Sequence, residues 1–287
     1  MKSTNAIWRA LVVLFAFSVI QAVAGMLTMS GIKPPASPHA TEWMLLSNSL
    51  VVAALAFVAF RSDLRGWQLG AAMAGVPLAI GCVNAIEGVF FLTNSVISWP
   101  RLFAFLILSA VLILPVWALL FGKRTDVPQD HFHPMGSKSS IEKLWKFAVS
   151  DLAYSFLYLT AGVIVFPYVK DFYATQHLPP MTSILAMQLL FRGPVFVLLC
   201  LALVRMLGLP RFAGALAVGL VFTIISGVAP LLTPSVVFPD AVRWAHFCEV
   251  TSSNFVFGAL VGWLWGQSKQ TAPAALRNEN EKVQSWA

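Results

Sequence analysis

The sequence predicts an all-α membrane protein that crosses the bilayer about eight times, as two parallel four-helix repeats. Three features of the chain predict it: its composition, its apolar runs and its internal similarity. Hydrophobic residues make up 58% of the 287 residues and charged residues only 11%. Soluble domains carry about 25% charged residues. A fold with this composition could not cover its apolar surface in water, so it needs lipid as its solvent.

Eight apolar runs divide most of the chain into segments of about 20 residues, the length that crosses hydrocarbon. Backbone amides find no hydrogen-bond partner in lipid, so runs of this length must be helical. Tryptophans near many run ends fit an interfacial belt, where an apolar ring meets water through its N–H. The expected spans are Ile7–Met29, Trp43–Phe60, Trp67–Ser95, Leu102–Phe121, Trp145–Val169, Ser183–Met206, Phe212–Ala229 and Val242–Gly266.

The net charge of +7 is distributed as in a membrane protein. Basic chains can bind nucleic acid, but these Lys and Arg residues lie in short links between apolar runs, so no nucleic-acid partner is expected. Fourteen of them fall on one side of the predicted topology and four on the other, with Arg192 inside a span. Because positive residues concentrate on the cytoplasmic side, both termini are predicted to be cytoplasmic.

No cofactor or metal is predicted. Asp130 and the histidines at 131 and 133 carry metal-binding groups, but nothing near them completes a coordination shell, so a solvated loop is expected. An HExxH motif, a second spanning histidine for haem and a glycine-rich phosphate loop are all absent from the sequence. The cysteines lie inside apolar runs without CxxC spacing, which is typical of packing residues: Cys82, Cys200 and Cys248.

The two halves of the sequence resemble each other. Trp8 and Trp145 are 137 positions apart, as are Ser18 and Ser155. After one insertion the shift settles at 144 or 145, and the later matches are Pro34-Pro35 with Pro179-Pro180, Gly70-Ala71-Ala72 with Gly214-Ala215-Leu216, and Gly122 with Gly266. A shift that stays almost constant indicates an internal duplication. Each half has an even number of spans, which predicts parallel repeats about an axis along the membrane normal.

The duplication divides the chain into four parts. They are the first four-helix repeat (1–122), a cytoplasmic linker (123–144), the second four-helix repeat (145–266) and a polar cytoplasmic tail (267–287). The first span has features of a signal peptide, because Lys2 and Arg9 precede its apolar core and Ala22-Val23-Ala24 resembles a cleavage site. Its counterpart in the second half is an internal helix, so we expect the first span to be retained.

The last span carries the strongest polar pattern. Ionisable groups in hydrocarbon are costly, so by default they face the bundle interior and have a partner. Arg243, His246, Glu249 and Ser253 are spaced so that they share one helical face, with Asn254 beside them. His246 and Glu249 can carry protons or bind metal, and a structural hydrogen-bond network is the alternative.

The sixth span carries Gln188 and Arg192 one turn apart, followed by Gly193-Pro194. Arg192 lies near mid-membrane, where an unpaired guanidinium is very unfavourable. Glu249 is the expected partner, because a long arginine side chain can reach outward by about a turn. A buried Arg–Glu pair is favoured over anion binding by Arg192.

Two other spans also have polar faces. The fifth carries four polar residues on one face toward its cytoplasmic end: Asp151, Tyr154, Ser155 and Tyr158. Asp151 is expected to be interfacial. The third span carries Asn84 and Glu87 one turn apart in its outer half. Glu87 lies deeper and is harder to explain as interfacial.

These residues define the predicted site. We expect Arg192, His246 and Glu249 to meet in one interior cluster, with Glu87 as a candidate fourth member. The wider solute or proton site adds Gln188, Ser253 and Asn254, and a secondary set contains Asp151, Tyr154 and Tyr158. The aligned first-half positions are mostly not ionisable: Asn48 for Arg192, Gln21 for Tyr158, Leu102 for His246 and Phe105 for Glu249. A purely architectural role gives little reason for such asymmetry.

One part of the sequence resembles a family of uncharacterised bacterial multi-pass membrane proteins. The resemblance is carried by Arg192-Gly193-Pro194 and by the pattern Arg243-x-x-His246-x-x-Glu249-x-x-Ser252-Ser253-Asn254-Phe255. It is clearest over residues 145–266. It implies a setting in the bacterial inner membrane and implies nothing about chemistry.

Three functions compete at this point. Parallel repeats, a Gly-Pro interruption and mid-membrane charges favour transport of a small molecule or a proton-coupled solute. A non-catalytic assembly or sensor component, whose charges are structural, is the alternative. A membrane-embedded enzyme built on His246 and Glu249 ranks lower, because known catalytic motifs are absent. The expected partners are the lipid bilayer and a small-molecule or ion ligand, and the oligomeric state is left open.

Overall fold

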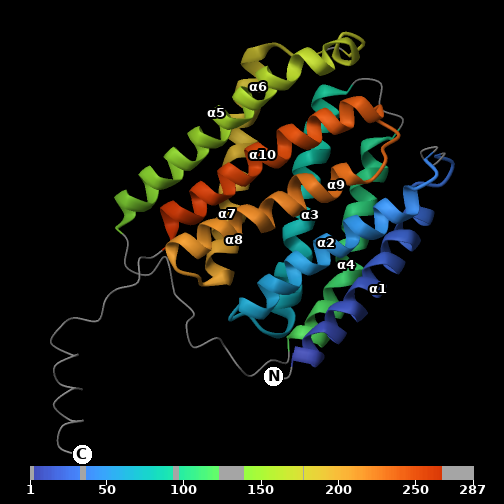
Figure 1. The fold of residues 1–287 in the computed structure, drawn as a ribbon, viewed down its shortest axis with the longest axis vertical. Helices are drawn as coiled ribbons and strands as arrows, with labels where there is room; N and C mark the ends of the chain where they lie inside the picture. Colours follow the sequence, from blue (N-terminus) through green and yellow to red (C-terminus); the bar gives the residue numbers. More distant parts are fainter. Residues whose placement is uncertain (1–2, 33–36, 93–96, 123–138, 177, 267–287) are drawn as a thin grey trace, which may run out of the picture.

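The computed structural model is a bundle of helices (Figure 1). Eight of its helical spans are long and apolar enough to cross a membrane. The part of the chain that it describes contains no strand. The predicted all-α, multi-pass membrane fold is therefore confirmed. The described residues are 3–32, 37–92, 97–122, 139–176 and 178–266.

Six of the spans are uninterrupted α-helices, and two contain a π-helical segment, labelled η. The uninterrupted spans are α1 (Ser3–Thr28), α2 (Ala40–Arg61), α3 (Gly66–Phe91), α4 (Trp99–Phe121), α5 (Ser140–Tyr173) and α10 (Asp240–Trp265). The sixth span consists of α6 (Met181–Met187), η1 (Gln188–Arg192) and α7 (Gly193–Leu207). The seventh consists of α8 (Arg211–Thr223), η2 (Ile224–Val228) and α9 (Ala229–Leu232).

Both π-helical segments come just before a proline. Pro194 and Pro230 have no N–H, so each removes the helical bond to the carbonyl four residues earlier. The backbone widens before each proline, and a backbone N–H there bonds a carbonyl five residues earlier. Such π turns are rare and occur frequently at functional sites. The sixth and seventh spans therefore mark the part of the bundle where a site is expected.

The helices of the two halves pack in the same order. In each half the third span packs most extensively on the fourth, then the fourth on the first, then the first on the second. Small residues set both closest crossings: Gly70 lies against Ala118, and Gly262 lies against Gly214 and Ala215. The predicted duplication requires this shared order. The symmetry between the halves remains a prediction.

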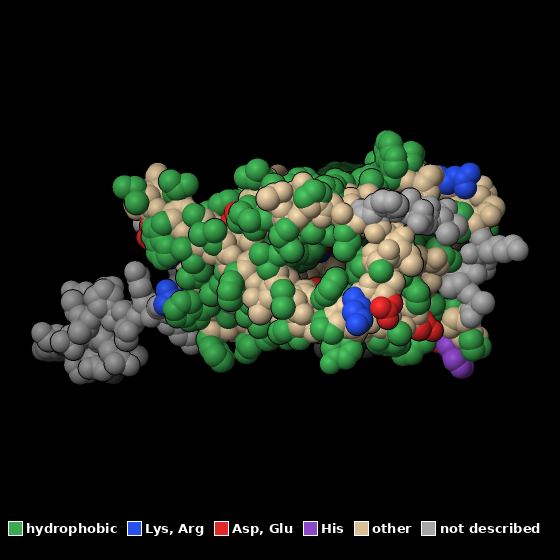
Figure 2. Space-filling model, turned by 90° about the horizontal axis from the view of Figure 1, so that it is seen from above, with side chains coloured by type: hydrophobic (Ala, Val, Ile, Leu, Met, Phe, Trp, Pro, Cys, Tyr) green, Lys and Arg blue, Asp and Glu red, His purple; other side chains and the backbone are tan. Residues whose placement is uncertain are grey.

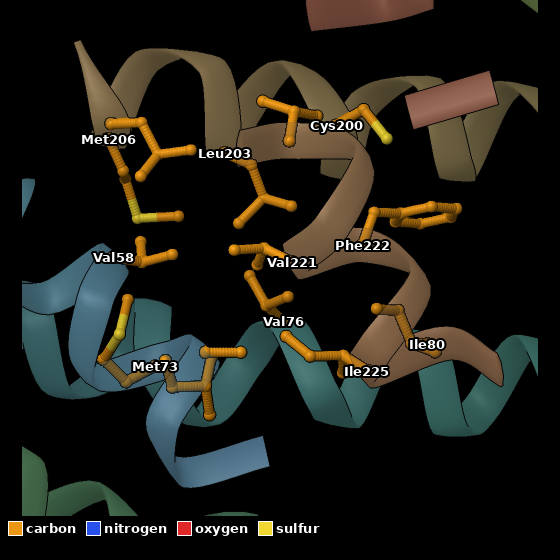
Figure 3. Packing of buried hydrophobic residues seen from close by; sticks show 14 of the residues in the cluster. Val58, Met73, Val76, Ile80, Cys200, Leu203, Met206, Val221, Phe222 and Ile225 are labelled. Atoms are coloured by element: carbon orange, nitrogen blue, oxygen red, sulfur yellow. The ribbon is translucent and has the colours of Figure 1, made fainter. Parts of the chain in front are cut away.

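The two ends of the bundle differ in their interiors. We call the end where α1 begins and α10 ends the lower end (lower left in Figure 1), and the opposite end the upper end. The interior toward the lower end is apolar, and Figure 3 shows side chains of α2, α3, α7, α8 and η2 in contact there. Buried residues in this group include Val58, Met73, Val76, Leu203, Met206 and Val221. No polar path is expected through such packing.

The outside of the bundle is apolar as well. Hydrophobic side chains dominate the face seen in Figure 2. Large ones such as Phe15, Val111 and Phe156 are 74%, 61% and 68% exposed. Apolar surface of this extent is far larger than a soluble monomer exposes, so we attribute it to contact with lipid.

Candidate functional site

Arg192 is the centre of the polar interior. It is the last residue of η1, and its side chain is only 5% exposed. Its Nη1 forms an ion pair with Glu87 Oε1 on α3, and its Nη2 donates a hydrogen bond of 3.4 Å to Asn84 Oδ1. The sequence predicted Glu249 as the partner of Arg192, and that pairing is wrong. Glu87, the candidate fourth member, holds the position instead.

Asn84 connects the two π-helical segments. Its Oδ1 accepts from Arg192 on η1, and its Nδ2 donates to the carbonyl oxygen of Ser226 on η2 at 3.2 Å. Ser226 lies four residues before Pro230, which has no N–H to offer that carbonyl. The asparagine side chain therefore satisfies a backbone group that the helix itself leaves free. Asn84 also links α3 of the first half to two spans of the second.

Aromatic rings surround the guanidinium of Arg192. The distances from its Cζ to the ring centroids are 5.1 Å for Phe196, 5.3 Å for Tyr158 and 5.8 Å for Tyr154. Cations within about 6 Å of an aromatic ring are attracted to its face, most strongly where water is excluded. Tyr154 and Tyr158, predicted only as a secondary set, thus lie directly at Arg192.

A second polar group lies on α10. Its members are His246 and Glu249, which share a helical face as predicted, with His246 Nδ1 2.7 Å from Glu249 Oε2. The other ring nitrogen, Nε2, is 3.0 Å from the hydroxyl of Tyr173 at the end of α5. Both ring nitrogens of His246 are therefore engaged, which fixes the orientation of the ring between two groups that can exchange protons.

Both groups belong to the polar interior, but no hydrogen bond or ion pair among the described residues joins them, so the meeting of Arg192 with His246 and Glu249 stays a prediction. The acidic and imidazole side chains keep some exposure, 19% for Glu87, 16% for His246 and 11% for Glu249. We define Arg192, Glu87, His246 and Glu249 as the polar cluster. Figure 2, which looks at the bundle from above, shows a hollow near the centre of this face with charged side chains at its floor.

Several polar atoms beside the cluster lack a partner among the described residues. Gln188 is fully buried, and neither atom of its amide is hydrogen-bonded; the same holds for Nε of Arg192. Gln188 precedes Arg192 by one turn on the same segment. Buried polar groups in folded proteins nearly always bind protein, water or ligand. Unsatisfied amide and guanidinium atoms side by side indicate a place where a polar solute can bind.

The remaining predicted residues lie in different surroundings. Asn254 donates to Ser226 Oγ at 2.7 Å and so joins α10 to η2, below the cluster. Ser253 bonds back to the carbonyl of Glu249 at 2.8 Å within its own helix. Arg243 donates to the carbonyls of Leu231 and Leu232 and so closes the end of α9. These three residues are placed for structure.

Asp151 does not fit the interfacial position expected for it. Its Oδ1 lies against Gly193, the residue after Arg192, so close that a Cβ at Gly193 would be 2.0 Å from it. Gly193 is near the middle of the sixth span. The carboxylate is thus inside the bundle, one residue from the centre of the site.

Below Arg192 the interior closes with aromatic rings. Tyr154, Phe196, Phe222 and Phe257 stack edge to face, with centroid distances of 5.0 to 5.6 Å. The three phenylalanines are fully buried. These rings separate the polar cluster from the apolar interior of the lower end. The polar cluster therefore lies on the upper side of these rings.

The sequence did not predict two residues that contact the site, Tyr173 and Ser226. Tyr173 lies beyond the predicted end of its span, and Ser226 has only Thr223 as a polar neighbour on its helix. The proline four residues after Ser226 was a usable signal, because it predicts a carbonyl that needs another donor. Tyr173 had no comparable signal, since its role depends on where α5 meets α10.

Comparison with known proteins gives no matching family model, curated protein or solved structure. Among the described residues, no group of three or more His, Cys, Asp or Glu side chains could hold a metal ion. The candidate loop ligands Asp130, His131 and His133 lie outside the described residues. A function for the protein therefore has to be inferred from the geometry of the polar cluster.

Proposed function

We propose that this protein is a proton-coupled secondary transporter of a small organic or inorganic anion, with Arg192 and Glu87 as its binding site. One observation carries the proposal. A guanidinium buried in mid-span pairs with a single carboxylate beside amide and guanidinium atoms that have no partner among the described residues. An arginine in this setting can exchange its carboxylate for that of a solute, because the two present the same oxygen atoms.

The coupling to protons follows from charge. When a solute anion takes Arg192, Glu87 loses its partner in a medium of low dielectric constant. An unpaired carboxylate there is costly, and taking up one proton removes the charge. Entry of one anionic group thus requires entry of one proton. The Tyr173–His246–Glu249 group, which leads toward the upper end, supplies side chains that can deliver it.

The interrupted spans support a movement. Arg192 ends η1, and Ser226 lies in η2, so both segments border the cluster. Transporters commonly build their sites from interrupted helices where two repeats meet, and expose the site alternately by rocking one repeat against the other. Here α3 of the first half meets η1 and η2 of the second at the cluster.

The proposal is tested in proteoliposomes that contain a pH-sensitive dye. Succinate, citrate, aspartate and inorganic phosphate are added outside at equal pH. We expect at least one of them to acidify the lumen in the presence of the protein and not in empty liposomes. The matched control is Arg192→Leu/Glu87→Leu, which removes both charges without leaving either one unpaired. Acidification by none of the anions, or equal acidification by the double variant, would overturn the proposal.

We infer that the protein lies in the bacterial cytoplasmic membrane with both termini in the cytoplasm. The distribution of Lys and Arg between the two sides supports it. A cysteine introduced at Ser137, after replacement of the native cysteines by alanine, is expected to react with a membrane-impermeant maleimide only after the cells are permeabilised. Labelling of intact cells at this position would reverse the topology.

A further inference from the structure

Asp151 lies beside the site and has no role in it so far. Its Oδ1 fills the space where a side chain at position 193 would be. That position is glycine, which is the only residue that leaves room for the carboxylate. The π turn of η1 ends at the same point, so α5 approaches the sixth span at its interruption.

This carboxylate has no cation beside it. Within the described part of the chain, Oδ1 of Asp151 is buried without a hydrogen-bond partner, as is Oγ of Ser155 one turn further along α5. Lys146 on the same helix pairs with Glu142 at 2.6 Å, and Arg192 is turned toward Glu87. An ionised carboxylate inside the bilayer without a cation is costly, whereas a protonated one is not. The surroundings of Asp151 therefore favour its protonated form.

The charged and titratable groups that could act on Asp151 lie on α5 and on the elements packed against it. α5 packs against η1, α7 and α10. The groups on these elements are Arg192 on η1, Cys200 and Arg205 on α7, and Asp240, Arg243, His246, Cys248 and Glu249 on α10, with Glu142, Lys143, Lys146, Tyr154, Tyr158, Tyr168, Lys170, Asp171 and Tyr173 on α5 itself. Arg243 and Asp240 pair with each other at the upper end, and His246 pairs with Glu249. Arg192 is the cation nearest in sequence to the contact at Gly193.

Two tyrosine rings follow Asp151 along α5. Tyr154 is one turn from Asp151 and Tyr158 lies a second turn further along the same face. The guanidinium of Arg192 already lies against both rings, 5.8 Å from the first centroid and 5.3 Å from the second. If the guanidinium moves from the Tyr158 ring toward the Tyr154 ring, it keeps a cation–π contact throughout the movement. The side chain can thus turn toward Asp151 without losing its aromatic neighbours.

We propose that Asp151 is a second proton-binding carboxylate and the alternative partner of Arg192. In the state described here Arg192 pairs with ionised Glu87 and Asp151 holds a proton. In the other state Arg192 pairs with ionised Asp151, which has released its proton, and Glu87 has taken one up. One proton is bound and one released in each exchange, so the net charge of the interior is unchanged. The directional use of this exchange rests on the proposed transport function; the proton on Asp151 does not.

Infrared difference spectroscopy in lipid nanodiscs tests the first part without any solute. A protonated carboxyl group gives a C=O band that shifts in deuterium oxide. We expect one such band of the wild-type protein at neutral pH to be lost in Asp151→Asn. The matched control is Asp171→Asn, on the exposed upper end of the same helix, which should leave the band in place. If the spectra of Asp151→Asn and Asp171→Asn agree, Asp151 carries no proton and the proposal fails.

Glu87→Gln tests the exchange of partners. This variant removes the charge that holds Arg192, so the guanidinium should turn to Asp151 and the Asp151 band should disappear. Glu249→Gln is the control, because it leaves the Arg192–Glu87 pair intact and should keep the band. A band that persists in Glu87→Gln would show that Arg192 does not reach Asp151 and would overturn the exchange. Because no solute is present, these results stand apart from the flux test of the transport proposal.

Discussion

Among the polar contacts that join the two halves of the bundle, two differ in kind. At one, Ser47 of α2 donates a buried hydrogen bond of 2.7 Å to the carbonyl of Ala229 in α9. At the other, Arg192 of η1 binds Glu87 and Asn84 of α3. Asn48, the neighbour of Ser47, aligns with Arg192 at a shift of 144. The contact between the second and seventh spans is thus the counterpart of the contact between the sixth and third spans. The first contact uses neutral groups, and the second uses charged groups.

The difference shows which of the two contacts the architecture requires. A neutral hydrogen bond is enough to join the halves at one contact. The other contact carries an ion pair that adds little net stability when it is buried, because removing two charges from water is expensive. A pair that architecture alone does not require is best explained by function. The comparison therefore supports a solute site at Arg192.

Removal of Glu87 is expected to have the largest effect on stability. In Glu87→Leu the guanidinium of Arg192 stays buried without its carboxylate, which costs about 3–5 kcal/mol. Arg192→Leu/Glu87→Leu should recover most of this loss, because two apolar side chains replace the pair. Denaturant titration in mixed detergent micelles measures both. A double variant as unstable as Glu87→Leu would mean that the ion pair is not what holds the contact.

The fold could be predicted because spans are local features. Each of the eight apolar runs coincides with one observed span apart from a few residues at its ends, and the requirement for helix in lipid fixes the conformation. The ends were less predictable. α5 starts at Ser140, before the predicted Trp145, because Ser139 caps it by accepting a hydrogen bond from the N–H of Glu142. The π turns were not predicted, because a proline can also be accommodated by a kink.

The residues of the site could be found from the sequence, but their partners could not. Arg192, Glu87, His246 and Glu249 were identified because ionisable groups inside apolar runs are rare. Which carboxylate meets Arg192 depends on the rotation and depth of α3 and α10, and spacing along one helix does not determine these. The same limit applies to Asp151, whose depth depends on where a long helix crosses the sixth span.

The comparison assumes that the two halves are structurally equivalent. The close helix crossings at Gly262 and at Ala118 test this assumption. A Cβ at Gly262 would lie 2.7 Å from both Ala215 Cα and Gly214 O, so Gly262→Ala should cost about 1–3 kcal/mol. The aligned residue in the first half is Ala118, which faces Gly70. Ala118→Gly creates no clash and should cost about 0.5–1 kcal/mol. If Gly262→Ala and Ala118→Gly lost equal stability in the same micelle titration, the helix spacing at the two crossings would not differ.

The neutral contact gives a smaller effect. Ser47→Ala removes one donor from the carbonyl of Ala229 and should cost about 0.5–1.5 kcal/mol. Anion-driven acidification should be unchanged, because this contact lies outside the polar cluster. Thermal unfolding and the liposome flux measurement check the two expectations together. Loss of flux in a stable Ser47→Ala protein would show that both contacts take part in transport, and the contrast between them would fail.

The smallest expected effect separates the two carboxylates that could serve Arg192. A double-mutant cycle between Arg192→Leu and Glu249→Leu should give a coupling of about 0.5 kcal/mol, the lower limit for residues in one network. Glu249 acts on Arg192 only at a distance, whereas it hydrogen-bonds to His246 directly. The parallel cycle with Glu87→Leu shares the same arginine variant and should give a coupling several times larger. If the Glu249 cycle gave the larger value, Glu249 would be the true partner, and the charged contact between the halves would lie on α10 instead of α3.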